Sequence, residues 1–179
     1  VWYVDDVGTN GEGSSTSPFN QIQAAIDSAA AGTDTVMVLP GTYEGVGNFE
    51  IYLSNKDLII TSEKGADSTI LSSDNNHRHF SISNGVSPNT NIIGFTFKNG
   101  QPGNNEYEGG SIWIDGASPQ FYNCTFTQNE AENGGAVAVM WSGGLPGFNN
   151  CVFRDNVASN TNGEANGGAV FIADFNYAS

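Results

Sequence analysis

The strongest constraint on the fold of this chain is an internal repeat. Residues 119–126 (PQFYNCTF) align with residues 146–153 (PGFNNCVF) at an offset of 27, and five of the eight positions are identical. Each copy leads into a polar stretch and then a Gly-Gly-Ala-Val run, and a weaker third copy begins at Ile93. A unit of this length cannot bury its own apolar face, so it is stable only when it stacks on its neighbours. The repeat therefore predicts a solenoid.

Alternation within each copy predicts β-strands. Tyr122, Cys124 and Phe126 fall on one side of a period-two pattern, and the residues between them fall on the other. Equivalent positions of stacked strands lie about 4.8 Å apart. The sequence therefore predicts structural ladders in three places, namely Cys124 over Cys151, Phe126 over Phe153, and Asn129 over Asn156 at a turn. Free, buried thiols are favoured over a disulfide, because in-register strands rarely offer the geometry of a bridge.

The N-terminal part of the chain predicts a cap for one end of the stack. Apolar residues at helical spacing follow Ser17, a candidate cap, and Pro18, a candidate first helical residue. A short α-helix here would cover the open end of the solenoid. We expect a single all-β domain over residues 1–179, with an N-terminal strand and capping helix in 1–32 and about six stacked coils in 33–179. A longer parent chain would fit this modest number of coils.

Three further segments resemble a known superfamily. Residues 2–6 (WYVDD), 21–26 (QIQAAI) and 38–43 (VLPGTY) resemble the opening of pectin-lyase-like β-helix proteins. Residues 134–137 and 148–156 are similar to repeats of polymorphic outer-membrane proteins and other bacterial surface β-helix proteins. The resemblance implies a right-handed parallel β-helix and a secreted or cell-surface location. It does not imply an activity, because this fold carries lyases, hydrolases, esterases and adhesins alike.

Catalytic motifs of these enzymes are not matched. The esterase pattern is missing around Arg78 and Arg154, and the polygalacturonase aspartate cluster has no counterpart near His77. A lyase needs a basic residue beside carboxylate-bound calcium, and the chain offers few bases. The sequence therefore favours an extracellular module with a structural, adhesive or self-assembly role that binds glycans. The alternative is a polysaccharide lyase or glycoside hydrolase that acts on acidic polysaccharide.

Candidate ligand-binding residues fall into two groups. Trp113 and Trp141 follow Gly-Gly runs and are suited to stacking on sugar rings, while Arg78 and His77 are suited to binding an acidic sugar; packing and a solvated turn are the competing interpretations. Carboxylates before the Gly-Gly runs are suited to calcium, although solvated loops are the favoured interpretation. These carboxylates are Glu106, Glu108, Glu130, Glu132 and Glu164. Calcium is the one cofactor that the pattern suggests.

Charge and hydropathy limit the kinds of partner that we expect for this chain. Five Lys and Arg against 19 Asp and Glu give a formal charge of −14, which repels nucleic acid. The chain contains no apolar run long enough for a transmembrane helix. Its last coil is rich in apolar side chains, at Val170, Phe171, Ile172 and Phe175. We therefore expect either that the chain continues past Ser179 or that this end associates with a second copy.

Overall fold

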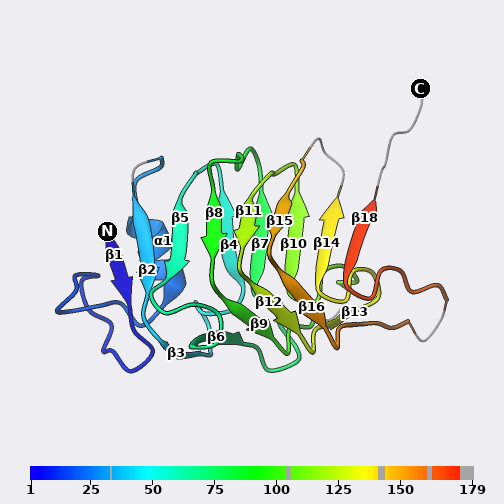
Figure 1. The fold of residues 1–179 in the computed structure, drawn as a ribbon, viewed down its shortest axis with the longest axis horizontal. Helices are drawn as coiled ribbons and strands as arrows, with labels where there is room; N and C mark the ends of the chain where they lie inside the picture. Colours follow the sequence, from blue (N-terminus) through cyan, green and yellow to red (C-terminus); the bar gives the residue numbers. More distant parts are fainter. Residues whose placement is uncertain (33, 104–105, 141–143, 161–162, 174–179) are drawn as a thin grey trace.

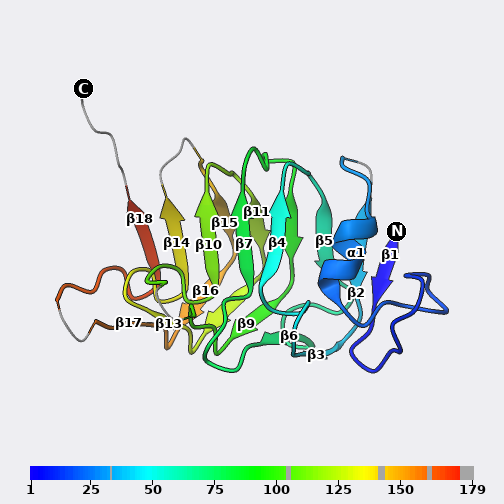
Figure 2. The ribbon, with the colours of Figure 1, turned by 180° about the vertical axis from the view of Figure 1, so that it is seen from behind.

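A computed structural model describes residues 1–32, 34–103, 106–140, 144–160 and 163–173. The chain is mostly β and winds as a parallel β-solenoid of about four turns, with one short helix near the N-terminus (Figure 1). Two sheets stand face to face along the length of the stack, and a third closes one side between them, as both views show (Figures 1 and 2). The predicted solenoid of parallel strands is therefore confirmed.

Each turn adds one strand to each of three long sheets. The first sheet contains β1 (Trp2–Val4), β2 (Thr35–Val38), β5 (Ile59–Ser62), β8 (Asn91–Ile93), β11 (Gln120–Tyr122) and β15 (Gly147–Asn149). The second contains β3 (Gly41–Tyr43), β6 (Thr69–Ser72), β9 (Thr96–Lys98), β12 (Thr125–Thr127) and β16 (Val152–Arg154). The third contains β4 (Ile51–Ser54), β7 (Phe80–Ser83), β10 (Ile112–Asp115), β14 (Val137–Met140) and β18 (Val170–Ala173). A small fourth sheet pairs β13 (Glu130–Ala131) with β17 (Val157–Ala158).

The coils are longer and fewer than the sequence predicts. Thr35 of β2 pairs with Ile59 of β5, which in turn pairs with Asn91 of β8, so one turn takes 24 residues and the next takes 32. The 27-residue repeat spans a later turn, from Gln120 of β11 to Gly147 of β15. Because the connections between strands use so many residues, the described strands complete about four turns rather than the six coils expected.

Aromatic residues stack through the interior as predicted. The Phe126 ring lies 5.0 Å from the Phe97 ring and 4.7 Å from the Phe153 ring, measured between centroids, and in both pairs the ring planes are nearly parallel. Phe126 is fully buried and Phe153 is half-buried. Cys124 and Cys151 are free thiols on the same two turns, Cys124 buried and Cys151 half-buried. Phe97, Phe126 and Phe153 thus stack on three consecutive turns, and the two cysteines lie on the last two of these turns.

An asparagine ladder stabilises the turn after the second sheet. The Asn129 Nδ2 donates to Asn156 Oδ1 (2.9 Å) and to the Phe97 carbonyl (3.1 Å), and its Oδ1 accepts from the Gly100 N–H (2.8 Å). One turn further on, Asn156 Nδ2 donates in the same way to the Phe126 carbonyl (2.9 Å). Each side chain thus satisfies backbone groups of the preceding turn.

The alternation expected over residues 121–126 is wrong at its first positions. Phe121, Cys124 and Phe126 point into the core, whereas Tyr122 lies on the outer face. The cause is Asn123, whose φ of 52° is in the left-handed region and bends the chain between β11 and β12. Asparagine tolerates this conformation better than most residues do. The segment is therefore two short strands at a corner and not one continuous strand.

The short helix α1 (Ile22–Ser28) buries Ile22, Ala25 and Ile26 against the first turn of the stack. Figure 2 shows it at the N-terminal end, beside the third sheet. The prediction of a helix is confirmed, but its predicted start is wrong, because the residue before the first turn is Gln21 and no side chain of its own caps it. Asn48, from the next turn, accepts a hydrogen bond from the Ile22 N–H instead (2.9 Å). A tertiary contact thus replaces the local Ser17 cap.

Within the part of the chain that the structure describes, no helix is long and apolar enough to cross a membrane.

Candidate functional site

A groove crosses the outer face of the third sheet. It has a volume of about 430 Å³ and is lined by Glu50, Tyr52, Arg78, Ser81, Ser83, Glu106, Glu108 and Trp113. Tyr52 pairs with Ser81 and Ser81 pairs with Trp113 on three consecutive strands. Since neighbouring strands lie about 4.8 Å apart, the Tyr52 and Trp113 backbones are about 10 Å apart. The two aromatic side chains therefore stand on either side of a serine.

The period-two pattern of the strands puts these residues on the surface. In β4, Ile51 and Leu53 are buried, while Tyr52 between them is 64% exposed. In β10, Ile112 and Ile114 are likewise buried, and Trp113 projects outward from the same strand. The core positions of each strand thus determine which side chains line the groove.

Arg78 organises one end of the groove. Its Nη2 lies 3.0 Å from the Glu106 carboxylate and donates a 2.9 Å hydrogen bond to the Glu108 carbonyl. The residue is only 8% exposed, and this burial lowers the pKa of Arg78 from its usual value, while the carboxylates of Glu106 and Glu108 oppose the shift. An arginine keeps its charge even so. Arg78 therefore holds the loop before β10 against the sheet, and its charge is already paired.

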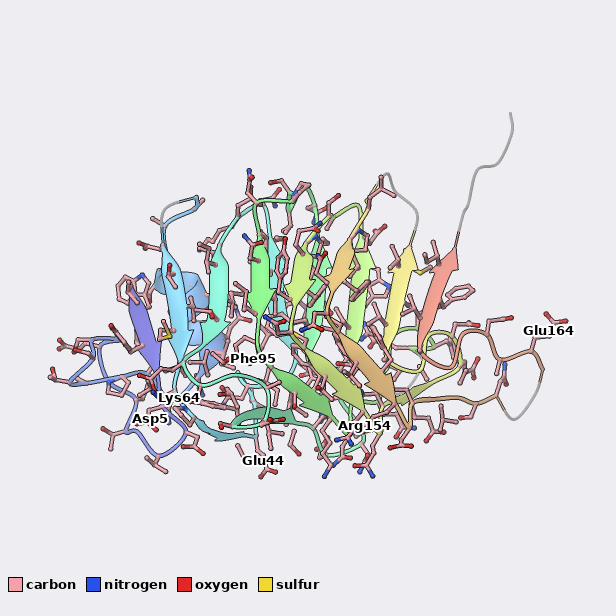
Figure 3. All side chains as sticks on the ribbon, in the orientation of Figure 1. Asp5, Glu44, Lys64, Phe95, Arg154 and Glu164 are labelled. Carbon is pink, nitrogen blue, oxygen red and sulfur yellow. The ribbon has the colours of Figure 1, made fainter. Side chains whose placement is uncertain are left out.

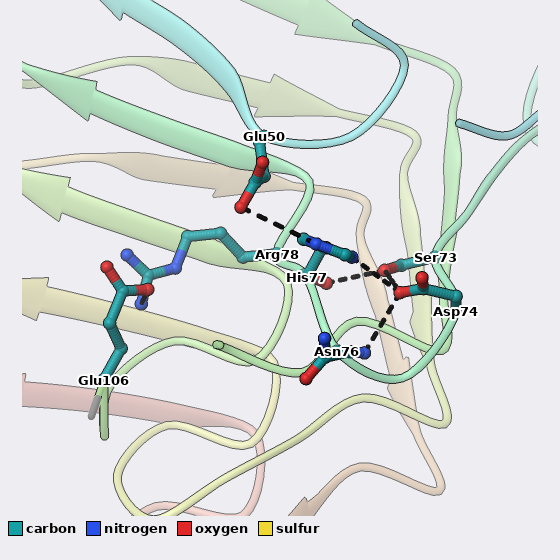
Figure 4. Close-up of polar contacts among 7 residues, drawn as sticks. All are labelled: Glu50, Ser73, Asp74, Asn76, His77, Arg78 and Glu106. Atoms are coloured by element: carbon teal, nitrogen blue, oxygen red, sulfur yellow. Dashed lines mark hydrogen bonds and ion pairs between the residues drawn. The ribbon is translucent and has the colours of Figure 1, made fainter. Parts of the chain in front are cut away.

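His77 lies next to the groove, and its ring lies between the carboxylates of Asp74 and Glu50 (Figure 4). Its Nδ1 is 2.7 Å from the Asp74 carboxylate, and its Nε2 is 3.9 Å from the carboxylate of Glu50. The ring also stacks on Phe49, with centroids 4.4 Å apart. The hydrogen bond with His77 lowers the pKa of Asp74. His77 does not line the groove itself; it contacts Glu50, which lies at the edge of the groove.

The other histidine is structural. His79 is fully buried beside Phe97, and its Nδ1 is 3.0 Å from the Ser111 hydroxyl. Burial lowers the pKa of His79 to about 4, so its ring is neutral at physiological pH. It belongs to the core and does not reach the groove.

The predicted sugar-binding residues come together only in part. Arg78 and Trp113 line the same groove, His77 lies at its edge, and Trp141 is outside the described residues. The sequence reasoning missed Tyr52, because it follows no Gly-Gly run. The alternating segment Ile51–Ser54 carries the missing signal, since an aromatic residue at an outward position of a strand is exposed.

The predicted calcium carboxylates are spread along one edge of the stack. Backbone bridges join Glu108 to Asn133 and Asn133 to Asn166, which shows that the three acidic loops do lie beside one another. However, Glu106 pairs with Arg78, and Glu130 accepts a hydrogen bond from Ser159. Glu132 is half-buried and Glu164 is exposed. Among the residues with described positions, no three or more His, Cys, Asp or Glu side chains form a metal-binding group, and calcium stays a prediction.

Comparison of the chain with curated proteins and with solved structures gave no match. A family model described as "Protein of unknown function (DUF1565)" matches residues 6–174, which include every strand of the three long sheets except β1. The match extends over nearly the whole chain. This β-solenoid therefore belongs to the DUF1565 family.

Proposed function

We propose that this chain is a non-catalytic extracellular module that binds a glycan in the groove of the third sheet. The observation that carries the proposal is the ladder of Tyr52, Ser81 and Trp113 across the groove floor. The faces of pyranose rings carry C–H groups that pack on aromatic side chains, and a rigid aromatic contributes a large contact area at low entropic cost. The spacing of about 10 Å lets one short oligosaccharide contact both rings.

Charge favours a neutral glycan. Among the described residues that line the groove, Glu50, Glu106 and Glu108 carry carboxylates, and Arg78 carries a positive charge that is already paired with Glu106. Carboxylate oxygens accept hydrogen bonds from sugar hydroxyls but repel a uronate. The acidic polysaccharide expected from the sequence is therefore a poorer fit for this groove than an uncharged one.

The extracellular location and the right-handed winding form part of the same proposal. The N-terminal resemblance to pectin-lyase-like proteins supports both. General chirality also supports the winding, because crossovers between parallel strands of one sheet are right-handed in about 98% of cases. On the same resemblance, we propose that this chain is a distant member of the pectin-lyase-like superfamily.

Calorimetric titration with neutral and acidic oligosaccharides tests the proposal. A neutral β-linked glucan or xylan fragment should bind, and Trp113→Ala or Tyr52→Ala should weaken binding by at least about tenfold. Tyr122→Ala is the matched control, because Tyr122 is a half-buried aromatic residue on the outer face of the first sheet. Absence of binding, or equal weakening by all three variants, would show that the groove is not a sugar site.

The enzyme alternative has one observation in its favour. Glu50 and Glu106 come from different turns and line the same groove, and most glycoside hydrolases use a pair of carboxylates. Incubation with the same oligosaccharides, followed by chromatography of the products, decides between binding and hydrolysis. If shorter products are released and Glu106→Gln abolishes their release, the chain is a hydrolase and not a non-catalytic binding module.

Self-assembly is the second candidate function, and the last described turn favours it. Strands β15, β16 and β18 each pair with a neighbour on one side only among the described residues. Val152 and Ile172 on these strands are 51% and 63% exposed. An unpaired, apolar strand edge accepts a further strand, so we expect association of two copies there. Light scattering over a concentration series should show it, Ile172→Lys should abolish it, and a monomeric wild type would refute it.

A further inference from the structure

Basic side chains are rare in this chain, and their contacts single out two of them. The Lys56 ammonium donates to the carbonyls of Ile26 and Ala29, Arg78 pairs with Glu106, and Lys64 lies 3.8 Å from the Glu63 carboxylate. These three account for all but two of the five Lys and Arg residues. Lys98 and Arg154 make neither an ion pair nor a side-chain hydrogen bond with any residue that the structure describes.

The fold brings these two cations together on the outer face of the second sheet. Lys98 pairs with Thr127, and Thr127 pairs with Arg154, on three consecutive strands. Thr127 is only 5% exposed, although it faces the surface between two long side chains. Figure 3 shows Arg154 at the lower edge of the solenoid, pointing away from the core. Two unpaired cations thus flank one hydroxyl.

A hollow of about 360 Å³ lies over this column. Its lining residues are Ala66, Asp67, Ile70, Thr96, Lys98, Thr127, Gln128, Arg154 and Asp155. The Lys98 and Arg154 backbones are about 10 Å apart, because they are separated by two strand spacings. Both side chains are long enough to reach a group held over Thr127. The hollow therefore offers two positive charges, a hydroxyl and the Gln128 amide to one small ligand, beside the carboxylates of Asp67 and Asp155.

We propose that this hollow binds a single oxyanion of the carboxylate or sulfate type between Lys98 and Arg154. The Arg154 guanidinium matches such a group with two parallel N–H donors, and Lys98 adds a point charge. The Thr127 hydroxyl and the Gln128 amide supply neutral donors. This site lies on the second sheet, separate from the groove of the third sheet, and it does not depend on the function proposed for that groove.

The acidic character of the whole chain restricts the ligand to a small group. Asp67 and Asp155 also line the hollow, but neither forms an ion pair with Lys98 or Arg154 in the described part of the chain. Salt screens charges beyond about 8 Å at physiological ionic strength, so the carboxylates outside the hollow act only weakly on a small ligand inside it. A long polyanion would extend across those carboxylates and be repelled. A single charged group avoids this repulsion.

Titration of the folded protein with two probes, sodium sulfate and sodium galacturonate, tests the site at constant ionic strength. The amide resonances of residues 98, 127 and 154 report binding in nuclear magnetic resonance spectra, and we expect saturable shifts with at least one probe. Tighter binding of sulfate identifies a sulfated ligand, and tighter binding of galacturonate identifies a carboxylate. An absence of saturable shifts with either probe at tens of millimolar would overturn the proposal.

Variants that remove one positive charge distinguish a specific anion-binding site from nonspecific attraction of an anion to positive charge. Lys98→Gln and Arg154→Gln should each raise the dissociation constant by at least about tenfold. Lys64→Gln is the matched control, since it removes the same charge from a side chain that is 63% exposed and lies outside the hollow. If Lys64→Gln weakens binding as much as the other two, the effect is one of net charge and the site does not exist. Trp113→Ala should leave anion binding unchanged, whatever it does to glycan binding.

Thr127→Val gives a second readout that does not change the charge. It removes the hydroxyl but keeps the shape of a residue that is almost fully buried. Circular dichroism and thermal melting establish that the variant is folded. A folded Thr127→Val that binds the probes less tightly supports the predicted position of the anion, and unchanged affinity would move the anion away from Thr127 and contradict the proposal.

Discussion

The asparagine ladder gives the sharpest test of how the stack is held together. Asn129→Ala removes the acceptor of the Gly100 N–H and the donor to the Phe97 carbonyl, and both backbone groups are buried. A buried polar group that loses its partner costs about 1–3 kcal/mol, so the loss of both partners should lower the free energy of unfolding by about 2–6 kcal/mol. A typical domain has only about 5–15 kcal/mol in total. Urea denaturation followed by circular dichroism measures the change.

Asn123→Gly is the matched control for this experiment. The Asn123 side chain is exposed, and its Oδ1 accepts a hydrogen bond from Asn150 (2.7 Å) at the surface. Glycine adopts the positive φ of this corner without strain, so we expect a change within about 0.5 kcal/mol. If the two variants lose the same stability with the same dependence on urea, the reasoning from buried backbone groups is refuted.

Three further predictions concern the core. Phe126→Ala should cost about 3–5 kcal/mol in the same assay, and Phe153→Ala less, because Phe126 stacks on rings on both sides whereas Phe153 is half-buried. Because the pKa of His79 is lowered to about 4 in the folded protein, the unfolded chain binds a proton at this residue first as the pH falls. The free energy of unfolding should therefore drop by about 2 kcal/mol between pH 7 and 5. In a pH series, the His79→Gln variant should lack this drop. The hydrogen bond between the two thiols lowers the pKa of Cys151 to about 7, and the same hydrogen bond together with burial raises the pKa of Cys124. A thiol reagent at pH 8 should therefore modify Cys151 alone in the folded protein and both cysteines in urea, and modification of neither would contradict the free-thiol pair.

The interior of the solenoid could be predicted from the sequence where one turn repeats the next. Five identical positions in residues 119–126 and 146–153 align the Cys and Phe ladders directly, because in a stack of parallel coils sequence equivalence becomes spatial adjacency. The Asn129 and Asn156 pair follows from the same offset. Local corner geometry did not follow, since the positive φ of Asn123 changes which of Phe121 and Tyr122 points inward.

The two candidate binding surfaces depend on the tertiary structure. Tyr52 and Trp113 lie on either side of Ser81. Lys98 and Arg154 lie on either side of Thr127 in the same way. The two members of each pair are nevertheless separated in the sequence by two turns of unequal length. No single offset relates all of these residues, because the connections between strands differ in length from turn to turn; only Thr127 and Arg154 are separated by the 27 residues of the repeat. The sequence by itself determined that the chain stacks its coils and which side chains form the repeated interior. Only the fold decided which outward side chains face the same hollow, because strand pairing sets their spacing and loop length does not.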